Sequence, residues 1–559
     1  MTDYITRHRL KVATALQRFI DDQVLPGTGL HAEAFWEGFA DLVHELAPLS
    51  RDLLAERERL AALLNDWTAA NPAPRDPGAW RDWLIECGYL HSPPAQVRVS
   101  SANLDLEISD LAGPQLLVEG TDRAALLDAQ QARWGSLYDA LYQSDADQHR
   151  APATSAHDPQ RLARVVVQVR ELLDRFVPLA VGSHIDARRY RVRQGQLSVR
   201  LARGEETALR SPEHYLGHRG NPDQPDAVLL RHHGLHLELR FDPQSPAGGG
   251  DIATLADVRL ETALTALVDI TDPLPTVDAA GPLKTYGNWL ALMTDTLASE
   301  PSTKDRARPV PAHDLRYQGS AGGELLLPAR PLLALHVNAL QVNGPALLDV
   351  QGNPVSQLIV DATLGSLIGL HDRQRRGNSR TGSLYLNVPN LQGCQEAAFV
   401  QLLCQRIETL LELPEYTLKL GLVDEHWRTS LNLEACLQAI APRLALLRGP
   451  LEHARPAAQC PAWQATATQR RRAVAMACGL RGRVQLGVGP WSPLQPDERR
   501  QALHDGIGTG LVDTPLAATL HALDYHEVDV RERQAGLESQ AWAERCTHLL
   551  QNLLDQTPE

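Results

Sequence analysis

The segment Tyr416–Trp427, YTLKLGLVDEHW, decides which fold this sequence can adopt. It begins with an apolar, β-prone run, and two acids, Asp424 and Glu425, follow just before what looks like a helix start. A strand that is apolar on both faces is typical of a parallel sheet covered by helices. Carboxylates after such a strand lie where an α/β barrel holds a metal ion or a substrate. The segment therefore predicts a buried strand with a candidate site at its end.

The same succession of strand, loop and helix recurs after residue 260. Apolar runs separated by helix-length segments are TALTALVDITD (262–272), RPLLALHVNA (330–339), GSLYLNVPN (382–390), PRLALLRGP (442–450) and GRVQLGVGPW (482–491). This alternation predicts a parallel sheet buried on both faces. With GPQLLV (113–118) upstream and TPLAATLHAL (514–523) downstream, the number of strands approaches eight. The fold class expected is therefore α/β, a (β/α)8 barrel rather than an open sheet.

The rest of the chain divides into regions that differ in the spacing of their apolar and polar residues. Residues 1–90 indicate helices, and Ser50 is a candidate N-cap for the amphipathic run that follows it. The run ALLDAQQARWGSLYDALY (125–142) also has a helical pattern. From about 145 to 260, apolar and polar residues alternate as in half-buried antiparallel strands, which predicts a β-rich inserted unit.

Composition excludes several classes of protein. The chain has 559 residues, enough for about two to four domains, and a formal charge of −14, which disfavours a nucleic-acid surface. None of its seven cysteines forms a C-x-x-C pair, so neither a disulfide framework nor a zinc knuckle is indicated. The N-terminus lacks an apolar signal core, and no run approaches the roughly 18 apolar residues of a membrane span. We expect a cytoplasmic protein with no membrane or nucleic-acid partner.

Several motifs carry a resemblance to a known family. VLPGTGL (24–30), LLAERERL (53–60), ARWGSLYDALY (132–142), NSRTGSLYL (378–386), DEHWRTSLNL (424–433) and AATLHALDYH (517–526) appear in the family's order. The sequence resembles malate synthase G, which condenses acetyl-CoA with glyoxylate to give malate and CoA and uses Mg²⁺. The resemblance implies a helical clasp at 1–110, a barrel at 111–135 with 261–298 and 328–530, an inserted α/β domain at 136–260 with 299–327, and a C-terminal helical remnant at 531–559.

The resemblance also assigns metal positions. Glu425 matches the family's metal-ligand glutamate, although pairing with Arg428 at the barrel rim is an alternative role. The second metal carboxylate falls on His453, with Glu452 one residue away. An imidazole suits Zn²⁺, Mn²⁺ or Fe²⁺ better than Mg²⁺. The implied cofactor is therefore Mg²⁺, a softer metal if His453 is a ligand, or none.

The positions for catalysis and substrate binding depart from the family in part. His336 takes the place of the catalytic arginine, and the family's D-C-E-D-S becomes DITDP, which keeps Asp269 and Asp272. His336 and Asp272 are the catalytic candidates. The positions expected to contact the CoA thioester or 2-oxo acid are Val118, Arg123, Asp269 and Pro515.

Three functions stay open at this point. The family continues for more than a hundred further residues that carry its catalytic aspartate, and no position here matches that base. The chain could be a working malate synthase completed by another chain, or a repurposed acyl-CoA or small-acid enzyme. It could also be a silent paralogue that binds a ligand or a protein at an uncovered barrel mouth. Because the substitutions cluster at strand ends while scaffold motifs are kept, we expect altered or lost malate synthase activity.

Overall fold

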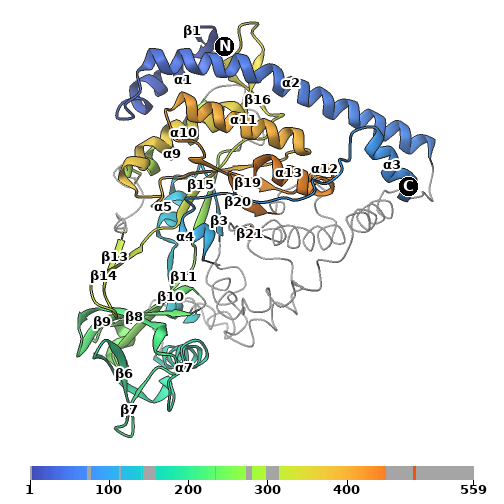
Figure 1. Ribbon diagram of the computed structural model, residues 1–559. Helices are drawn as coiled ribbons and strands as arrows, with labels where there is room; N and C mark the ends of the chain where they lie inside the picture. The colour runs from blue at the N-terminus through green and yellow to red at the C-terminus, as the bar shows by residue number, and fades with distance from the viewer. Residues whose placement is uncertain are drawn as a thin grey trace.

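The computed structural model describes residues 3–71, 77–111, 115–139, 141–142, 159–232, 234–271, 280–297, 314–448 and 483–485. Within these residues the centre of the molecule is a curled parallel sheet whose seven strands follow the order of the chain (Figure 1). They are β3 (Gln115–Glu119), β12 (Thr265–Asp269), β15 (Leu332–His336), β18 (Leu384–Val388), β19 (Leu418–Val423), β20 (Leu444–Arg448) and β21 (Arg483–Gln485). Each apolar run predicted between residues 113 and 491 overlaps one of these strands, which confirms the predicted α/β barrel fold. The run at 514–523 lies outside the described residues.

Helices cover the outer face of this sheet. They are α5 (Arg123–Gln131), α9 (Ala280–Thr294), α10 (Gln357–Arg375), α11 (Cys394–Leu410), α12 (Trp427–Leu431) and α13 (Leu433–Ile440). Alternate residues of β19, namely Leu418, Leu420 and Leu422, belong to the large apolar cluster between sheet and helices. Helix α10 approaches β15 closely at Gly365, where a Cβ would lie 2.3 Å from a methyl carbon of Leu335.

The amino end of the sheet is closed. Leu267, Ala334 and Tyr385 form an apolar layer inside the curl together with Ile108 of the short helix α4 (Leu106–Ser109). Asp105, which precedes α4, accepts a hydrogen bond from the Tyr385 hydroxyl at 2.8 Å. The carboxyl end of the strands is therefore where polar chemistry can gather.

The N-terminal segment lies across the helices of the barrel (Figure 1). It contains β1 (Tyr4–Arg7), β2 (Leu10–Ala13), α1 (Thr14–Phe19), the π-helix η1 (Ile20–Val24), α2 (Ala32–Ala70) and α3 (Pro77–Glu86). Strand β2 pairs with β16 (Asn343–Leu348), and β16 pairs in turn with β17 (Pro354–Ser356). The prediction that a helix begins at Ser50 is wrong, because α2 continues through Pro48 and Ser50. The Ser50 hydroxyl donates to the Ala47 carbonyl. Burial of the apolar face of α2 outweighs the hydrogen bond lost at Pro48.

The inserted unit lies at the end of the molecule opposite α2 (Figure 1). Its antiparallel sheet has the order β14-β13-β8-β9-β10-β11-β4, beside a three-stranded sheet β5-β6-β7. The bounds are β4 (Trp134–Ser136), β5 (Ala187–Arg193), β6 (Gln196–Leu201), β7 (Glu206–Ala208), β8 (Tyr215–Asn221), β9 (Gln224–His232), β10 (Leu235–Phe241), β11 (Leu255–Glu261), β13 (Asp314–Gly319), β14 (Glu324–Pro328), α7 (Pro159–Phe176), α8 (Pro246–Gly250) and two 3-10 turns, η2 (His184–Asp186) and η3 (Pro212–His214). The expected β-rich character is present.

The helical pattern predicted for residues 125–142 is interrupted. Helix α5 ends at Gln131, and β4 pairs with β11 of the insert. Arg133 explains the break, because its buried guanidinium bonds Glu261 of β11 at 2.8 Å and Glu107 of α4 at 2.7 Å. Tertiary pairing therefore overrides a local helical pattern. The residue numbers at which the predicted domains meet stay a prediction.

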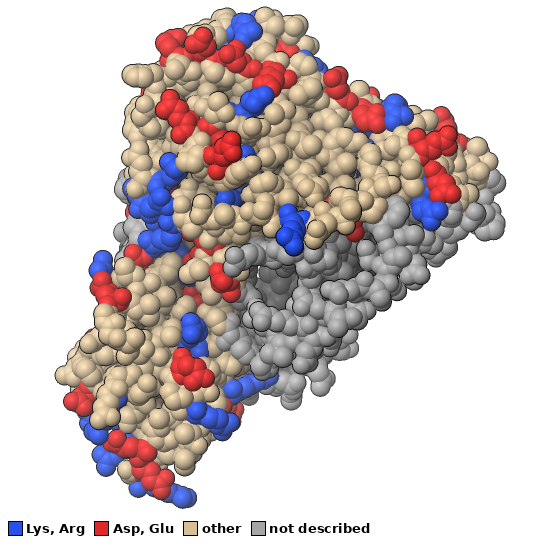
Figure 2. Space-filling view, viewed as in Figure 1, with Lys and Arg blue, Asp and Glu red and all other residues tan. Residues whose placement is uncertain are grey.

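The distribution of charged side chains on the described surface can be compared with the net negative charge of the sequence. Figure 2 shows basic and acidic side chains interspersed over the described part of this face. In the part of the chain that the structure describes, no helix has the length and apolar character needed to cross a membrane.

Candidate active site

Polar residues from neighbouring strands meet at the carboxyl edge of the parallel sheet. The strand register pairs Asp269 with His336, His336 with Asn387, and Asn387 with Gly421. Asp269, His336 and Asn387 each stand two residues after a member of the inner apolar layer, so their side chains share the inner face of the curl. The apolar sequence of each strand thus places its last polar residue at the barrel mouth.

His336 is buried and neutral. It is 2% exposed, and its Nδ1 lies 2.5 Å from Asn387 Nδ2. Burial lowers the pKa of His336 to about 4; the charge of Arg448 acts in the same direction, and that of Asp269 opposes it. Gly421 makes room for this pair, because a Cβ there would lie 2.4 Å from Asn387 Oδ1. At neutral pH, His336 therefore does not supply the positive charge of the arginine that the family resemblance puts at this position.

Glu425 lies in the turn after β19. Its Oε1 accepts a hydrogen bond from the Asn390 backbone amide at 2.5 Å. Asn390 has a φ of +54°, a left-handed conformation that asparagine tolerates, and its carbonyl accepts from Arg57 of α2 at 2.9 Å. Arg428, the alternative partner of Glu425, donates instead to the Gln392 carbonyl and to Gln395. The long N-terminal helix thus braces the loop that holds Glu425.

Asp424 and His426 have local roles. Asp424 accepts from the Ser430 hydroxyl at 2.5 Å, and its backbone amide donates to the Arg448 carbonyl. The His426 ring accepts from the Arg428 amide and caps α12. Within the DEHW turn, Glu425 lies close enough to Arg448 for its charge to act on that guanidinium.

Arg448 is the residue that sequence reasoning missed. It is the last residue of β20 and is 2% exposed. Burial lowers the pKa of Arg448 to about 10, while the charges of Glu425 and Asp269 oppose that shift, so the guanidinium stays protonated at neutral pH. A signal was available, because an arginine ends the otherwise apolar run RLALLR.

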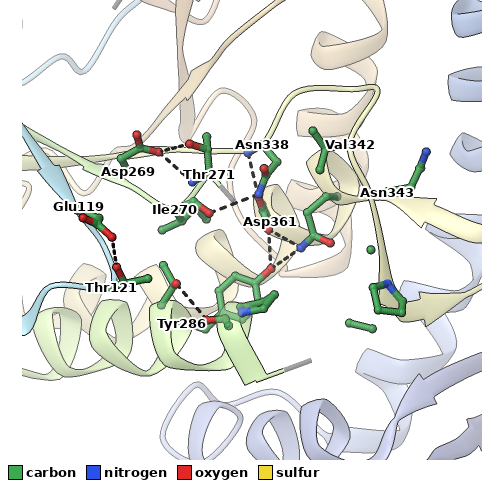
Figure 3. Close-up of a pocket in the computed structure, with 17 residues that line it drawn as sticks. Glu119, Thr121, Asp269, Ile270, Thr271, Tyr286, Asn338, Val342, Asn343 and Asp361 are labelled. Carbon is green, nitrogen blue, oxygen red and sulfur yellow. Dashed lines mark hydrogen bonds between the residues drawn. The ribbon is translucent and has the colours of Figure 1, made fainter. Parts of the chain in front are cut away.

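A cavity of about 240 Å³ borders Asp269 on the side of β3 (Figure 3). Asp269 Oδ1 accepts from the Thr271 amide and hydroxyl at 2.8 and 2.7 Å. Across the cavity, the Tyr286 hydroxyl donates to Asp361 at 2.5 Å, and Asn338 donates to the same carboxylate. Burial raises the pKa of Asp361. The polar groups of the cavity wall are therefore hydrogen-bonded to one another, and they lie beside apolar residues such as Ile270 and Val342.

The remaining predicted site residues do not all join this group. Val118 belongs to the apolar cluster between sheet and helices, and Arg123 donates to the Leu297 carbonyl from the start of α5. The other four predicted positions, Asp272, Glu452, His453 and Pro515, lie outside the described residues. The structure brings Asp269, His336 and Glu425 to one mouth, and their roles stay predictions.

The described residues do not fit a Mg²⁺ ion. Mg²⁺ needs a near-octahedral set of oxygen ligands. In the described ranges, no group of three or more His, Cys, Asp or Glu side chains is arranged to hold a metal. The cation whose charge acts on Glu425 and Asp269 is the Arg448 guanidinium.

Comparison with known proteins decides the family. Three domain families match in order: the malate synthase N-terminal domain over residues 15–77, the malate synthase G alpha-beta insertion domain over 157–232, and the malate synthase TIM barrel domain over 340–450. Malate synthase G of Halalkalibacterium halodurans is 35% identical over 550 residues, which cover 92% of this chain and 75% of that protein. The chain belongs to the malate synthase G family.

A second sequence relative agrees with this assignment, whereas the solved structures are too dissimilar to bear on it. Malate synthase G of Corynebacterium efficiens is 36% identical over 565 residues, covering 96% of this chain and 75% of that protein. The solved Haloferax volcanii malate synthase lead(II) complex aligns with a TM-score of 0.28 and 13% identity over 53% of this chain and 84% of that one. The family assignment rests on the sequence relatives, and it makes this chain a malate synthase G-like protein.

Proposed function

We propose that this malate synthase G-like protein has altered or lost the reaction of acetyl-CoA with glyoxylate, and that its barrel mouth takes a small carboxylic acid. The observation that carries the proposal is the state of His336. The family resemblance puts a permanently charged arginine at this position, where its charge would stabilise the negative charge that develops in the reaction. A buried imidazole with a pKa near 4 is neutral when the reaction would run.

The start of α5 supports a change in CoA binding as well. The resemblance assigns Arg123, at the start of this helix, to substrate or CoA binding, and a helix N-terminus is a favourable place for phosphate. Here the Asp122 carboxylate caps the helix by accepting from the Ala124 and Ala125 amides. Arg123 donates to the Leu297 carbonyl. An anionic cap therefore holds the backbone donors that a phosphate would use.

Thiol release tests the proposal. The full chain is incubated with acetyl-CoA, glyoxylate and Mg²⁺, and free CoA is followed with a thiol reagent. Malate synthase G of Corynebacterium efficiens, assayed in parallel, is the positive control. We expect a rate at least about 100-fold below the control, the scale on which loss of one group that stabilises developing charge slows catalysis. A rate within about tenfold of the control would overturn the proposal.

A further inference from the structure

The guanidinium of Arg448 is buried, and some of its N–H donors make no hydrogen bond. Its Nε and Nη1 have no hydrogen-bond partner, and no described residue accepts a hydrogen bond from this side chain. The side chain belongs to a residue that is 2% exposed. An arginine offers five N–H donors in a rigid plane, so the unfilled capacity at this position is large.

Such a group is rare in a folded protein. Nearly all buried polar groups have a partner, because an unpaired donor keeps the full cost of leaving water, and a charged donor costs more than a neutral one. Two other buried arginines of this protein show the usual arrangement. Arg133 and Arg443 each bind carboxylates at 2.5 to 2.8 Å. Arg448 departs from that pattern at the edge of the sheet where barrel sites form.

The surrounding acids are held by other donors. Asp269 accepts from Thr271, and Glu425 accepts from the Asn390 amide. Neither acid accepts a hydrogen bond from Nε or Nη1 of Arg448, although both act on its charge. The site therefore presents one cation with open donors, flanked by two carboxylates that are already hydrogen-bonded.

We propose that Arg448 is the anion-binding residue of the barrel mouth, and that it binds the carboxylate of a small monocarboxylic acid directly. This inference rests on the proposed function, in which the mouth takes a small acid, and it assigns that acid's recognition to β20 rather than to His336. Guanidinium and carboxylate form short, charge-assisted hydrogen bonds. A second negative charge on the ligand would meet Asp269 and Glu425, so a monoanion fits better than a dianion of similar size.

Calorimetric titration of the full chain tests the proposal, with glyoxylate as the monoanion and oxalate as the dianion, each in EDTA. We expect glyoxylate to bind at least about tenfold more tightly than oxalate. Arg448→Gln should weaken glyoxylate binding at least about 30-fold. Arg448→Lys keeps the charge but loses the planar donor pair, so its affinity for glyoxylate should lie between that of the parent and that of Arg448→Gln. Arg316→Gln, on an exposed arginine of the insert, is the matched control and should bind as the parent does.

The outcomes separate the inference from the proposed function. If Arg448→Gln and the parent bind glyoxylate within twofold, or if the folded parent binds no glyoxylate, the assignment of Arg448 is wrong. Tighter binding of oxalate than of glyoxylate overturns the choice of a monoanion. Should Arg448→Gln fail to fold, as judged by circular dichroism, Arg448→Lys decides, and affinity equal to the parent's refutes the role of the planar guanidinium. A rapid thiol release would refute the proposed loss of activity and leave these binding results unaffected.

Discussion

Replacement of Arg57 by methionine should destabilise the protein strongly and loosen the barrel mouth. The Arg57 guanidinium bonds both oxygens of Glu396 on α11 at 2.5 Å, and it also bonds Gln341 and the Asn390 carbonyl. The Arg57 side chain is 10% exposed and that of Glu396 is 1% exposed. In Arg57→Met, the buried Glu396 carboxylate loses both hydrogen bonds from Arg57 and keeps the one from the Gln392 backbone amide. Breaking one side of a buried pair costs about 3–5 kcal/mol.

A second ion pair between the same two helices provides the control. Arg406 of α11 binds Glu45 of α2 with similar two-pronged geometry, but these side chains are 38% and 41% exposed. Arg406→Met should cost at most about 1 kcal/mol, because water screens an exposed pair. Urea unfolding followed by circular dichroism compares the two variants. Hydrogen exchange should also rise at the Asn390 amide in Arg57→Met only.

Two results would refute this reasoning. Equal shifts of the urea midpoint in Arg57→Met and Arg406→Met would show that burial does not set the strength of the pair. The double variant Arg57→Met with Glu396→Leu removes the stranded charge, so it should regain part of the lost stability. A double variant less stable than Arg57→Met would show that the cost does not come from the unpaired carboxylate.

Two further predictions concern the mouth. Because the folded pKa of His336 is near 4 and the usual value is near 6.5, the unfolded chain binds more protons between these values, and stability falls as pH decreases. The free energy of unfolding should decrease by about 2 kcal/mol between pH 7 and pH 5 through this group. Urea unfolding at pH 7 and at pH 5 should show a smaller decrease for His336→Asn than for the parent. Equal decreases in the two proteins would contradict the burial argument. Glu425→Gln removes a carboxylate near Arg448, so calorimetry in EDTA should show glyoxylate binding about threefold or more tighter. Weaker binding, with a dependence on Mg²⁺ in the parent, would instead identify Glu425 as a cation ligand.

The sequence predicts the barrel well because its strands carry their own signal. Continuous apolar runs such as that of β19 have few alternatives to a parallel sheet covered by helices. Local patterns failed where distant contacts decided the structure. Ser50 stands inside a long helix that barrel packing maintains, and the helix predicted through residue 142 breaks because Trp134–Ser136 pairs with β11. Propensity alone carries no information about such partners.

The candidate site was predictable only in part. The family motif located Glu425, His336 and Asp269 at strand ends, and the structure places them at one mouth. The protonation state of His336 depends on burial and on the charges around it, which a motif does not contain. Arg448 escaped notice because its role arises from missing hydrogen bonds, a property of the folded surroundings rather than of the run RLALLR.

The strand order of the inserted sheet has a consequence for synthesis and for protein engineering. Its strands come from three separate stretches of chain, 134–136, 215–261 and 314–328, and barrel strand β12 lies between the last two. A nascent chain that has reached residue 261 still lacks the β13–β14 edge, so the insert is completed only after a barrel strand has been made. Deletion of the continuous stretch 187–261 would leave β4 and the β13–β14 hairpin with unpaired edges, which favour aggregation. A clean removal of the insert needs two coordinated cuts.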